Sequence, residues 1–265
     1  MKKINLRVDS KNLILTRSFN QISEVRNLFQ QKGANIFELP CLMIQYPDNL
    51  VPLDDALNEI NNFHWIIFSS SNGIKFVDSR LRDHGTSLKY CLKTTKIAVV
   101  GKNTAKTLLE LGINADYIPP NFVAESLINN FPISAYGLKV FIPRVQTGGR
   151  NIISQEFRNA GARVVEVAAY ESKCPQGIPK KTIDAIQDRK IDGIIFSSGK
   201  TVANASFLLE KQFGGDWISK FDDVKIFSIG PQTSLACQEI FGRVDREANN
   251  YNFQGLLEAV IEFFN

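Results

Sequence analysis

Short apolar runs that end in small polar residues or glycine alternate along the chain with segments whose apolar residues recur every three or four positions. One run covers 65–68 and is followed by Ser69, Ser70, Ser71 and Asn72, and another covers 193–196 and is followed by Ser197, Ser198, Gly199 and Lys200. Such a run is typical of a buried strand that turns into a helix at its carboxyl end. Phe196 stands 128 positions after Phe68, and this spacing indicates an internal repeat.

Nearly the same offset relates further segments. Leu15-Thr16-Arg17 corresponds to Ile142-Pro143-Arg144, Gly33-Ala34 to Gly161-Ala162, Val100–Thr104 to Ile229–Thr233, and Gly112 to Gly242. We infer that the chain is a duplication of one α/β segment. A length of 265 residues is sufficient for two domains, each with its own core.

The periodicity predicts alternating strands and helices. Strands are expected at 13–17, 34–39, 65–69, 96–101, 116–118, 138–142, 164–169, 192–197, 224–229 and 243–245. Helices are expected at 22–29, with Ser18 or Asn20 as its cap, and at 53–63, 73–81, 104–111, 124–130, 151–160, 180–188, 200–211, 232–241 and 253–264. Apolar strands that alternate with helices predict the α/β class, with two flavodoxin-like, doubly wound parallel sheets.

Both repeats contain an extended, proline-containing stretch after their second strand, at 40–52 and at 170–179. If the chain passes between domains at these stretches, residues 1–40 and 174–265 form one discontinuous domain and 41–173 form an inserted domain. The alternative is two contiguous halves that meet near Gly137. The composition of the two stretches favours the discontinuous arrangement.

The repeated motifs lie where ligands bind in parallel sheets, beyond the carboxyl ends of the strands. There, helix starts present unpaired N–H groups and a partial positive charge. We predict an anionic ligand that contacts this edge in both domains. The candidate residues are Arg17, Ser69, Ser70, Ser71, Asn72, Gly101, Lys102, Thr104, Arg144, Ser197, Ser198, Gly199, Lys200, Gly230, Gln232 and Thr233. Each also has a structural interpretation, as a helix cap, a tight turn or a solvated charge.

Composition narrows the classes of function. The net charge of +4 comes from scattered Lys and Arg, which favours a small anionic substrate over nucleic acid. No apolar run reaches the roughly 18 residues of a membrane span, and the first ten residues do not resemble a signal core, so a cytoplasmic protein is expected. Four separated cysteines and two histidines predict free thiols and no metal site. Fingerprints of dinucleotide-binding, nucleotide-phosphate and serine-hydrolase sites are absent from the sequence.

In their order and spacing, the motifs resemble the uroporphyrinogen-III synthase family from about Leu13 to Phe263. The residues that carry the resemblance are Leu15-Thr16-Arg17, Phe68 to Gly73, Val100-Gly101 with Thr104-Ala105 and Gly112, Ile142-Pro143-Arg144 with Gly149-Arg150, Gly161-Ala162 with Val167 to Tyr170, and Ile229-Gly230-Pro231 with Thr233. Ser69 stands where the family often has threonine, and Gln232 replaces another frequent threonine.

The resemblance implies two flavodoxin-like domains joined by a two-stranded linker. It implies cofactor-free closure of hydroxymethylbilane, a linear tetrapyrrole, to uroporphyrinogen III in tetrapyrrole biosynthesis, with inversion of ring D and loss of water. The family's tyrosine falls on Tyr170, the candidate catalytic residue, and Gly149 joins the substrate-binding candidates.

Alternatives from other classes are a non-catalytic tetrapyrrole- or solute-binding module and a glycosyltransferase with two facing α/β domains. A monomer is expected, with a transient contact to the enzyme that supplies hydroxymethylbilane.

Overall fold

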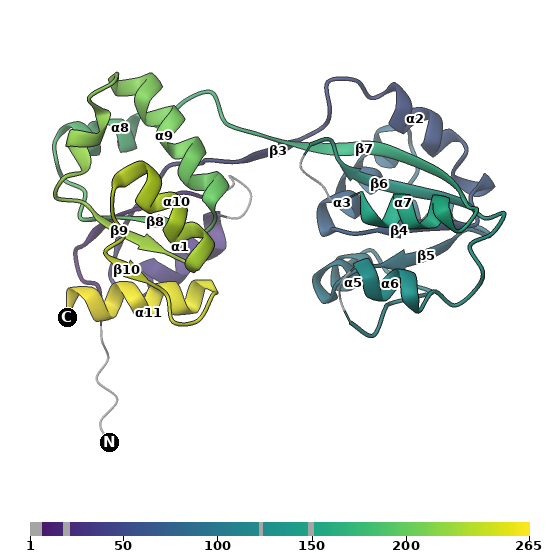
Figure 1. Ribbon diagram of the computed structural model, residues 1–265. Coiled ribbons are helices and arrows are strands. Elements are labelled where there is room, and N and C mark those ends of the chain that lie inside the picture. Colours follow the sequence, from purple (N-terminus) through teal and green to yellow (C-terminus); the bar gives the residue numbers. More distant parts are fainter. Residues whose placement is uncertain (1–6, 18–21, 122–123, 148–150) are drawn as a thin grey trace. The chain divides into compact units, whose positions relative to one another are not determined.

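The computed structural model describes residues 7–17, 22–121, 124–147 and 151–265 (Figure 1). The chain divides into two compact units, unit 1 with Met1–Met43 and Lys173–Asn265, and unit 2 with Ile44–Ser172. The chain enters unit 2 through β3 (Met43–Gln45) and leaves it through β7 (Arg163–Lys173), and these two strands are hydrogen-bonded neighbours. The expected cap residues Ser18 and Asn20 and the candidate Gly149 lie outside the described residues.

Within its described residues, unit 1 contains a parallel sheet in the order β10-β9-β8-β1-β2. The strands are β1 (Asn12–Leu15), β2 (Asn35–Glu38), β8 (Gly193–Phe196), β9 (Lys225–Ser228) and β10 (Arg246–Glu247). The helices are α1 (Ile22–Gln30), α8 (Lys180–Gln187), α9 (Gly199–Phe213), α10 (Pro231–Phe241) and α11 (Phe253–Phe264), with a 3₁₀ turn at Trp217–Phe221. In Figure 1, α8, α9 and α10 lie on one side of this sheet and α11 on the other.

In the described part of unit 2, the sheet has the order β3-β7-β6-β4-β5, and β7, β6, β4 and β5 are parallel. Its other strands are β4 (Trp65–Phe68), β5 (Lys96–Val99) and β6 (Lys139–Val145). The helices are α2 (Val51–Asn58), α3 (Ser71–Asp83), α4 (Leu88–Cys91), α5 (Lys102–Glu110), α6 (Ala124–Asn129) and α7 (Ile152–Asn159), with a 3₁₀ turn at Ile60–Asn62. The predicted α/β class with two parallel sheets is confirmed.

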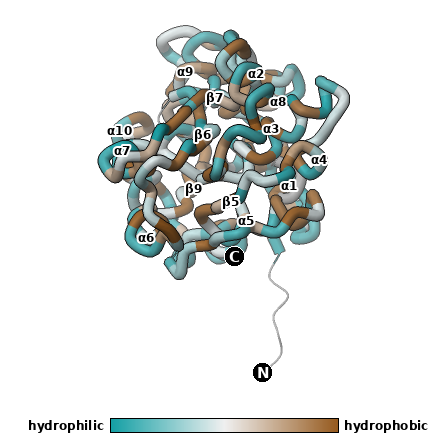
Figure 2. Tube along the Cα trace, turned by 90° about the vertical axis from the view of Figure 1, so that its right-hand side faces the viewer, coloured by the Kyte–Doolittle hydropathy of each residue, from teal (hydrophilic) through white to brown (hydrophobic). Residues whose placement is uncertain are grey.

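The strands bury both faces, because successive side chains point to opposite sides of a sheet. In β4, Ile66 and Phe68 pack with the residues of α2, α3 and α5, whereas Trp65 and Ile67 pack with those of α6 and α7. Each helix presents an apolar face to its sheet, and Figure 2 shows the resulting alternation of brown and teal along the helices. No helix in the described part of the chain has the length and apolar character of a membrane span.

Each sheet combines strands from both repeats. β1, from the first repeat, pairs with β8 from the second, and β4, from the first, pairs with β6 from the second. Unit 1 therefore combines the first two strands of the first repeat with later strands of the second, and unit 2 combines the first two strands of the second repeat with later strands of the first. Because the strands are parallel, their carboxyl ends, where the repeated motifs stand, meet at one edge of each sheet.

Two predicted strands were wrong in position. The segment at 116–118 makes only a single bridge, between Tyr117 and Ala98, and the segment predicted at 243–245 forms β10 at Arg246–Glu247 instead. An aspartate explains both differences. The carboxylates of Asp116 and Asp245 accept hydrogen bonds from the backbone N–H groups of Ile97 and Ile226, each at 2.8 Å. Regular pairing therefore begins only after the aspartate, and in unit 2 two prolines then end it.

Candidate active site

In unit 2, the candidate residues follow the carboxyl ends of neighbouring strands. Ser69–Asn72 follow β4, Gly101–Thr104 follow β5, Arg144 is near the end of β6, and Tyr170 on β7 pairs with Val145 of β6. We call this set the unit 2 edge. It brings the predicted serine-rich turn and the predicted catalytic tyrosine together within one domain.

Ser70 joins the start of α3 to Tyr170. Ser70 is extended (φ −152°), and its Oγ accepts a hydrogen bond from the N–H of Gly73 at 3.1 Å, as an N-cap residue does. The same Oγ lies 2.8 Å from the hydroxyl of Tyr170. The Tyr170 ring stacks on Phe76 with a centroid distance of 5.8 Å, and its residue is only 8% exposed. A buried ring and a hydrogen bond thus fix the phenol beside a helix start.

A second helix start at the unit 2 edge depends on Gly101. This residue has φ +99°, a conformation that other residues rarely adopt, and its carbonyl accepts the first hydrogen bond of α5, from Ala105. Lys102 is exposed at the same turn, whereas Thr104 is 4% exposed. Any ligand contact at this turn therefore falls to the backbone and Lys102 rather than to the Thr104 side chain.

Arg144 is held by groups of unit 2 itself. Its Nη1 donates to Glu166 Oε1 at 2.6 Å and also to the side chain of Asn151, and its Nε donates to the Val145 carbonyl at 3.0 Å. Burial raises the pKa of the Glu166 carboxyl, but hydrogen bonds from Arg144, Ser154 and Arg158 outweigh burial, so this pKa lies below its ordinary value. Arg144 is therefore one half of a charged pair at physiological pH.

In unit 1, the candidate residues likewise follow the carboxyl ends of the strands: Arg17 follows β1, Ser197–Lys200 follow β8 and Gly230–Thr233 follow β9. We call this set the unit 1 edge. Ser198 caps α9 by accepting from the Thr201 N–H at 3.2 Å, with Ser197, Gly199 and the exposed Lys200 beside it. The carbonyl of Gly230 accepts from the N–H groups of Thr233 and Ser234, both at 3.0 Å, at the start of α10. Gln232 is exposed there, whereas Thr233 is 3% exposed.

Arg17, at the end of β1, belongs to the same edge. Its guanidinium carbon lies 4.2 Å from the centroid of the Phe253 ring, at the start of α11. A cation over an aromatic face keeps its positive charge. The contact orients the guanidinium at the carboxyl ends of the strands.

A chain of hydrogen bonds at the unit 1 edge was not predicted from the sequence. Ser228 ends β9, and its Oγ lies 2.6 Å from Ser234 Oγ, which in turn donates to the carboxylate of Glu247 on β10. The signal available in the sequence was a serine as the last residue of an apolar strand. This chain fixes the first turn of α10, which the predicted Gly230–Thr233 segment opens.

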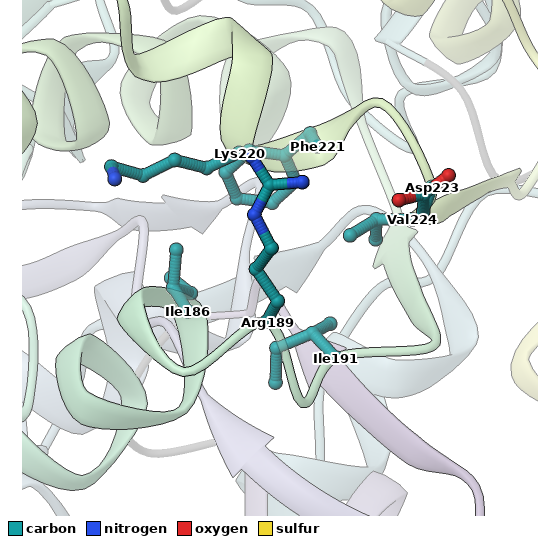
Figure 3. Close-up of a pocket in the computed structure, with 7 residues that line it drawn as sticks. All are labelled: Ile186, Arg189, Ile191, Lys220, Phe221, Asp223 and Val224. Carbon is teal, nitrogen blue, oxygen red and sulfur yellow. The ribbon is translucent and has the colours of Figure 1, made fainter.

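A pocket in unit 1 lies elsewhere (Figure 3). It is lined by Ile186, Arg189, Ile191, Lys220, Phe221, Asp223 and Val224. Ile191 precedes β8 and Val224 precedes β9, so the pocket is at the amino ends of the strands, opposite the unit 1 edge. We assign it no part in the candidate site.

The two edges can bind anions by the same means. Each presents the starts of two helices, α3 and α5 in unit 2 and α9 and α10 in unit 1, where N–H groups and the helix dipole favour negative charge. Exposed Lys102 and Lys200 add positive charge at one helix start in each unit. Such edges suit a ligand with several carboxylates, and the chemistry within reach is limited to hydroxyl groups and orientation.

Comparison with known proteins decides the family. A family model described as uroporphyrinogen-III synthase HemD matches residues 23–258. The chain belongs to the uroporphyrinogen-III synthase family. A curated uroporphyrinogen-III synthase of Synechococcus elongatus is 42% identical over 250 residues, which cover 94% of each chain. The resemblance on the sequence motifs is thereby confirmed.

Solved uroporphyrinogen-III synthases share the fold. The Helicobacter pylori protein aligns with a TM-score of 0.60 and 18% identity over 96% of this chain and 99% of that one. A mutant Thermus thermophilus protein aligns with a TM-score of 0.56 and 13% identity over 94% and 96%. The family assignment makes the chain a cyclising hydro-lyase of tetrapyrrole biosynthesis and does not favour a non-catalytic binding module.

Proposed function

We propose that this member of the uroporphyrinogen-III synthase family binds hydroxymethylbilane by its carboxylates at the carboxyl edges of its two sheets. It closes the linear tetrapyrrole to uroporphyrinogen III, with ring D inverted and one water lost. The substrate carries eight carboxylates. N–H groups at four helix starts, with scattered Lys and Arg, can hold such a ligand without a dense basic patch, so a net charge of +4 is sufficient.

The observation that carries the catalytic part of the proposal is the hydrogen bond between Ser70 and Tyr170. It holds a phenol hydroxyl beside a helix start that binds anions, and the buried ring prevents the phenol from rotating away. This arrangement supports a role for Tyr170 as the donor of a hydrogen bond to the departing hydroxyl of the substrate. Alternatively, its ring serves as a wall of the pocket in which ring D turns.

The reaction needs little acid–base machinery. The lone pair of a pyrrole nitrogen expels the hydroxyl at the end of the linear chain, and this hydroxyl leaves as water once it has gained a proton. The carbon that carried the hydroxyl becomes electrophilic. Ring D then attacks through its substituted carbon and forms a spiro intermediate. The older bond from that carbon to the methylene bridge of ring C breaks, and the unsubstituted α-carbon of ring D attacks the freed methylene carbon and loses its proton, which closes the macrocycle with ring D inverted. The main task of the enzyme is to hold the chain folded so that this carbon reaches the electrophile.

Incubation with freshly made hydroxymethylbilane, followed by separation of the type I and type III isomers, tests this function. Closure without inversion gives type I. We expect type III in excess and in proportion to enzyme concentration. Type I alone, at the rate seen without protein, would contradict the proposal.

The remaining predictions belong to the same proposal. The substrate-binding set includes Gly149, which a Gly149→Ala variant can test through KM. If residues 1–40 with 174–265 form one domain and residues 41–173 form the other, limited proteolysis should cut the chain first near residues 40 and 173.

We further propose a cytoplasmic monomer that makes a transient contact with the enzyme that supplies its substrate. Cell fractionation tests the location, light scattering tests the monomer, and crosslinking tests the contact.

A further inference from the structure

The loop between β10 and α11 extends the unit 1 edge. Glu247 of β10 is in register with Ser228, the last residue of β9, and the Ala248 N–H donates to the Ser228 carbonyl at 2.9 Å. The residues after Ala248 therefore lie beyond the carboxyl end of β9, where Gly230 begins α10. None of them was a candidate in the sequence analysis.

Tyr251 of this loop covers Gly230. A Cβ atom added to Gly230 would lie 3.1 Å from Cδ1 of the Tyr251 ring. The φ angle of Gly230 is 168°, which any residue adopts, so the feature that favours glycine here is the close approach of the ring. One side of the ring is thus seated on the backbone of the helix start, yet Tyr251 is 67% exposed.

The loop holds Tyr251 in place from both sides. The Asn252 N–H donates to the Asn250 carbonyl at 2.7 Å, and Asn252 Oδ1 caps α11 by accepting from the Gly255 N–H at 2.8 Å. The guanidinium of Arg17 lies over the ring of the next residue, Phe253. The Tyr251 ring thus contacts one helix start and lies two residues before the aromatic ring that Arg17 contacts. An exposed aromatic ring contributes little to the core, and it is suited to a ligand with both aromatic rings and carboxylates.

We propose that Tyr251 binds the tetrapyrrole substrate, with its ring against a pyrrole ring and its hydroxyl donating to a substrate carboxylate. Gly230 keeps the space that the ring needs, and the carboxylates beside that pyrrole lie within reach of the N–H groups of α10 and of Arg17. This inference rests on the proposed function. It adds an exposed aromatic binding residue to the helix starts and charged groups of the unit 1 edge.

The sequence of the other repeat agrees with this role. Asn121-Phe122 stands 129 positions before Asn250-Tyr251, so both repeats carry an aromatic residue at this point. Phe122 lies outside the described residues. The chain also provides a matched control in Tyr136, which is 82% exposed and likewise covers a glycine, Gly161. Tyr136 precedes β6 and Gly161 precedes β7, so this pair lies at the amino edge of unit 2.

Steady-state kinetics of Tyr251→Ala, Tyr251→Phe and Tyr136→Ala with hydroxymethylbilane test the inference. Loss of an aromatic contact predicts a KM about five- to tenfold higher for Tyr251→Ala, with kcat within about twofold of wild type. The KM of Tyr251→Phe should lie between the values of wild type and Tyr251→Ala, and the KM of Tyr136→Ala should equal the wild-type value. Thermal melts should show similar, small shifts for the two alanine variants.

The outcomes separate the two claims. A wild-type chain that makes no type III isomer overturns the proposed function. An active wild type whose KM is unchanged in Tyr251→Ala overturns the role of Tyr251 alone. An equal rise of KM in Tyr251→Ala and Tyr136→Ala also overturns it, because the effect would then not depend on the unit 1 edge.

Discussion

The serine-rich turns of the two units are built alike but bonded differently. Ser70 in unit 2 and Ser198 in unit 1 are both extended, with φ of −152° and −169°, and each accepts a hydrogen bond from the N–H three residues later. The side chain of Ser198 also lies near the hydroxyl of Thr201 in its own turn, at 3.5 Å. Ser70 reaches a different strand, where it meets Tyr170 at 2.8 Å.

This difference distinguishes the residues that stabilise the fold from the residue that we assign to the chemistry. A feature that both repeats keep, the serine cap, serves the fold in both units. The tyrosine is present in one repeat only, since the position 128 residues before Tyr170 is Leu42, which has no hydroxyl. The chemical role is therefore assigned to the residue that breaks the symmetry.

The arginines differ in the same way. Arg144 in unit 2 is paired with Glu166, whereas Arg17 in unit 1 lies on the Phe253 ring. The ion pair joins β6 to β7 within the sheet of unit 2, and the ring contact holds Arg17 at the carboxyl ends of the strands of unit 1. We expect Arg17 to act mainly on substrate binding and Arg144 mainly on the stability of unit 2.

The largest effect is expected from Tyr170→Phe. Without the hydroxyl, the departing group loses a hydrogen bond made in the transition state, so kcat should fall by ~10- to 100-fold at a similar KM. Tyr46→Phe is the control, because the Tyr46 ring also packs on Phe76 in unit 2 and its hydroxyl donates to the Phe76 carbonyl. Equal kcat values for the two variants would remove Tyr170 from the chemistry.

Arg17→Glu should raise KM about tenfold at low salt, because it reverses a charge that faces an anionic substrate, and the effect should shrink as salt is added. Arg189→Glu is the matched reversal at the opposite edge of the same unit. Arg189 has a φ angle of 54°, a conformation that is strained for residues with a Cβ atom. Because Arg and Glu both have a Cβ atom, the substitution does not change this backbone strain. A similar rise of KM in both variants would indicate a long-range charge effect rather than a contact.

Glu166→Gln should lower the free energy of unfolding by about 1 kcal/mol at pH 7, because the ion pair with Arg144 is lost. The folded-state pKa of Glu166 lies below its ordinary value of 4.5. Its stabilisation is therefore complete above that pH and is lost as the pH falls through the folded-state pKa. Urea unfolding at pH 7, 5, 4 and 3 should show a constant difference down to about pH 5 that then narrows. A difference as large at pH 3 as at pH 7 would refute the pairing.

The smallest effect concerns the segment at 116–118, which bridges Ala98 where unit 1 has β10. The Tyr117 hydroxyl is buried and has no hydrogen-bond partner among the described residues. Tyr117→Phe removes this unpaired group and should raise the free energy of unfolding by up to about 1 kcal/mol. Tyr46→Phe, which loses a bonded hydroxyl, should not. Destabilisation by Tyr117→Phe would reveal a partner for the hydroxyl.

Much of the fold could be predicted because it depends on local patterns. The helix at 253–264 was predicted with the bounds of α11, since its apolar face is visible in the sequence. The strand β10 was predicted too early in the chain because the carboxylate of Asp245 accepts a hydrogen bond from the backbone N–H of Ile226, and these residues are 19 positions apart. Periodicity carries no information on such a contact.

The candidate site was predictable as a set of strand ends, but its internal bonds were not. Ser70 and Tyr170 are 100 positions apart, and the register of β4, β6 and β7 brings them together. Thr104 and Thr233 were candidates from their position after the strands and from the family resemblance, but each lies on the buried face of the first turn of its helix. The pairing of Arg144 with Glu166 likewise depends on the sheet, which aligns β6 with β7.

The most direct test of the account compares Ser70→Ala with Ser198→Ala. Both variants lose an N-cap, so each should lower the free energy of unfolding by about 1 kcal/mol. Only Ser70→Ala also releases Tyr170, and the rate of type III formation under saturating hydroxymethylbilane should fall at least about fivefold in this variant, while Ser198→Ala stays near wild type. Equal rates in the two variants, at equal stability, would contradict the claim that the chemistry depends on the hydrogen bond present in one unit only.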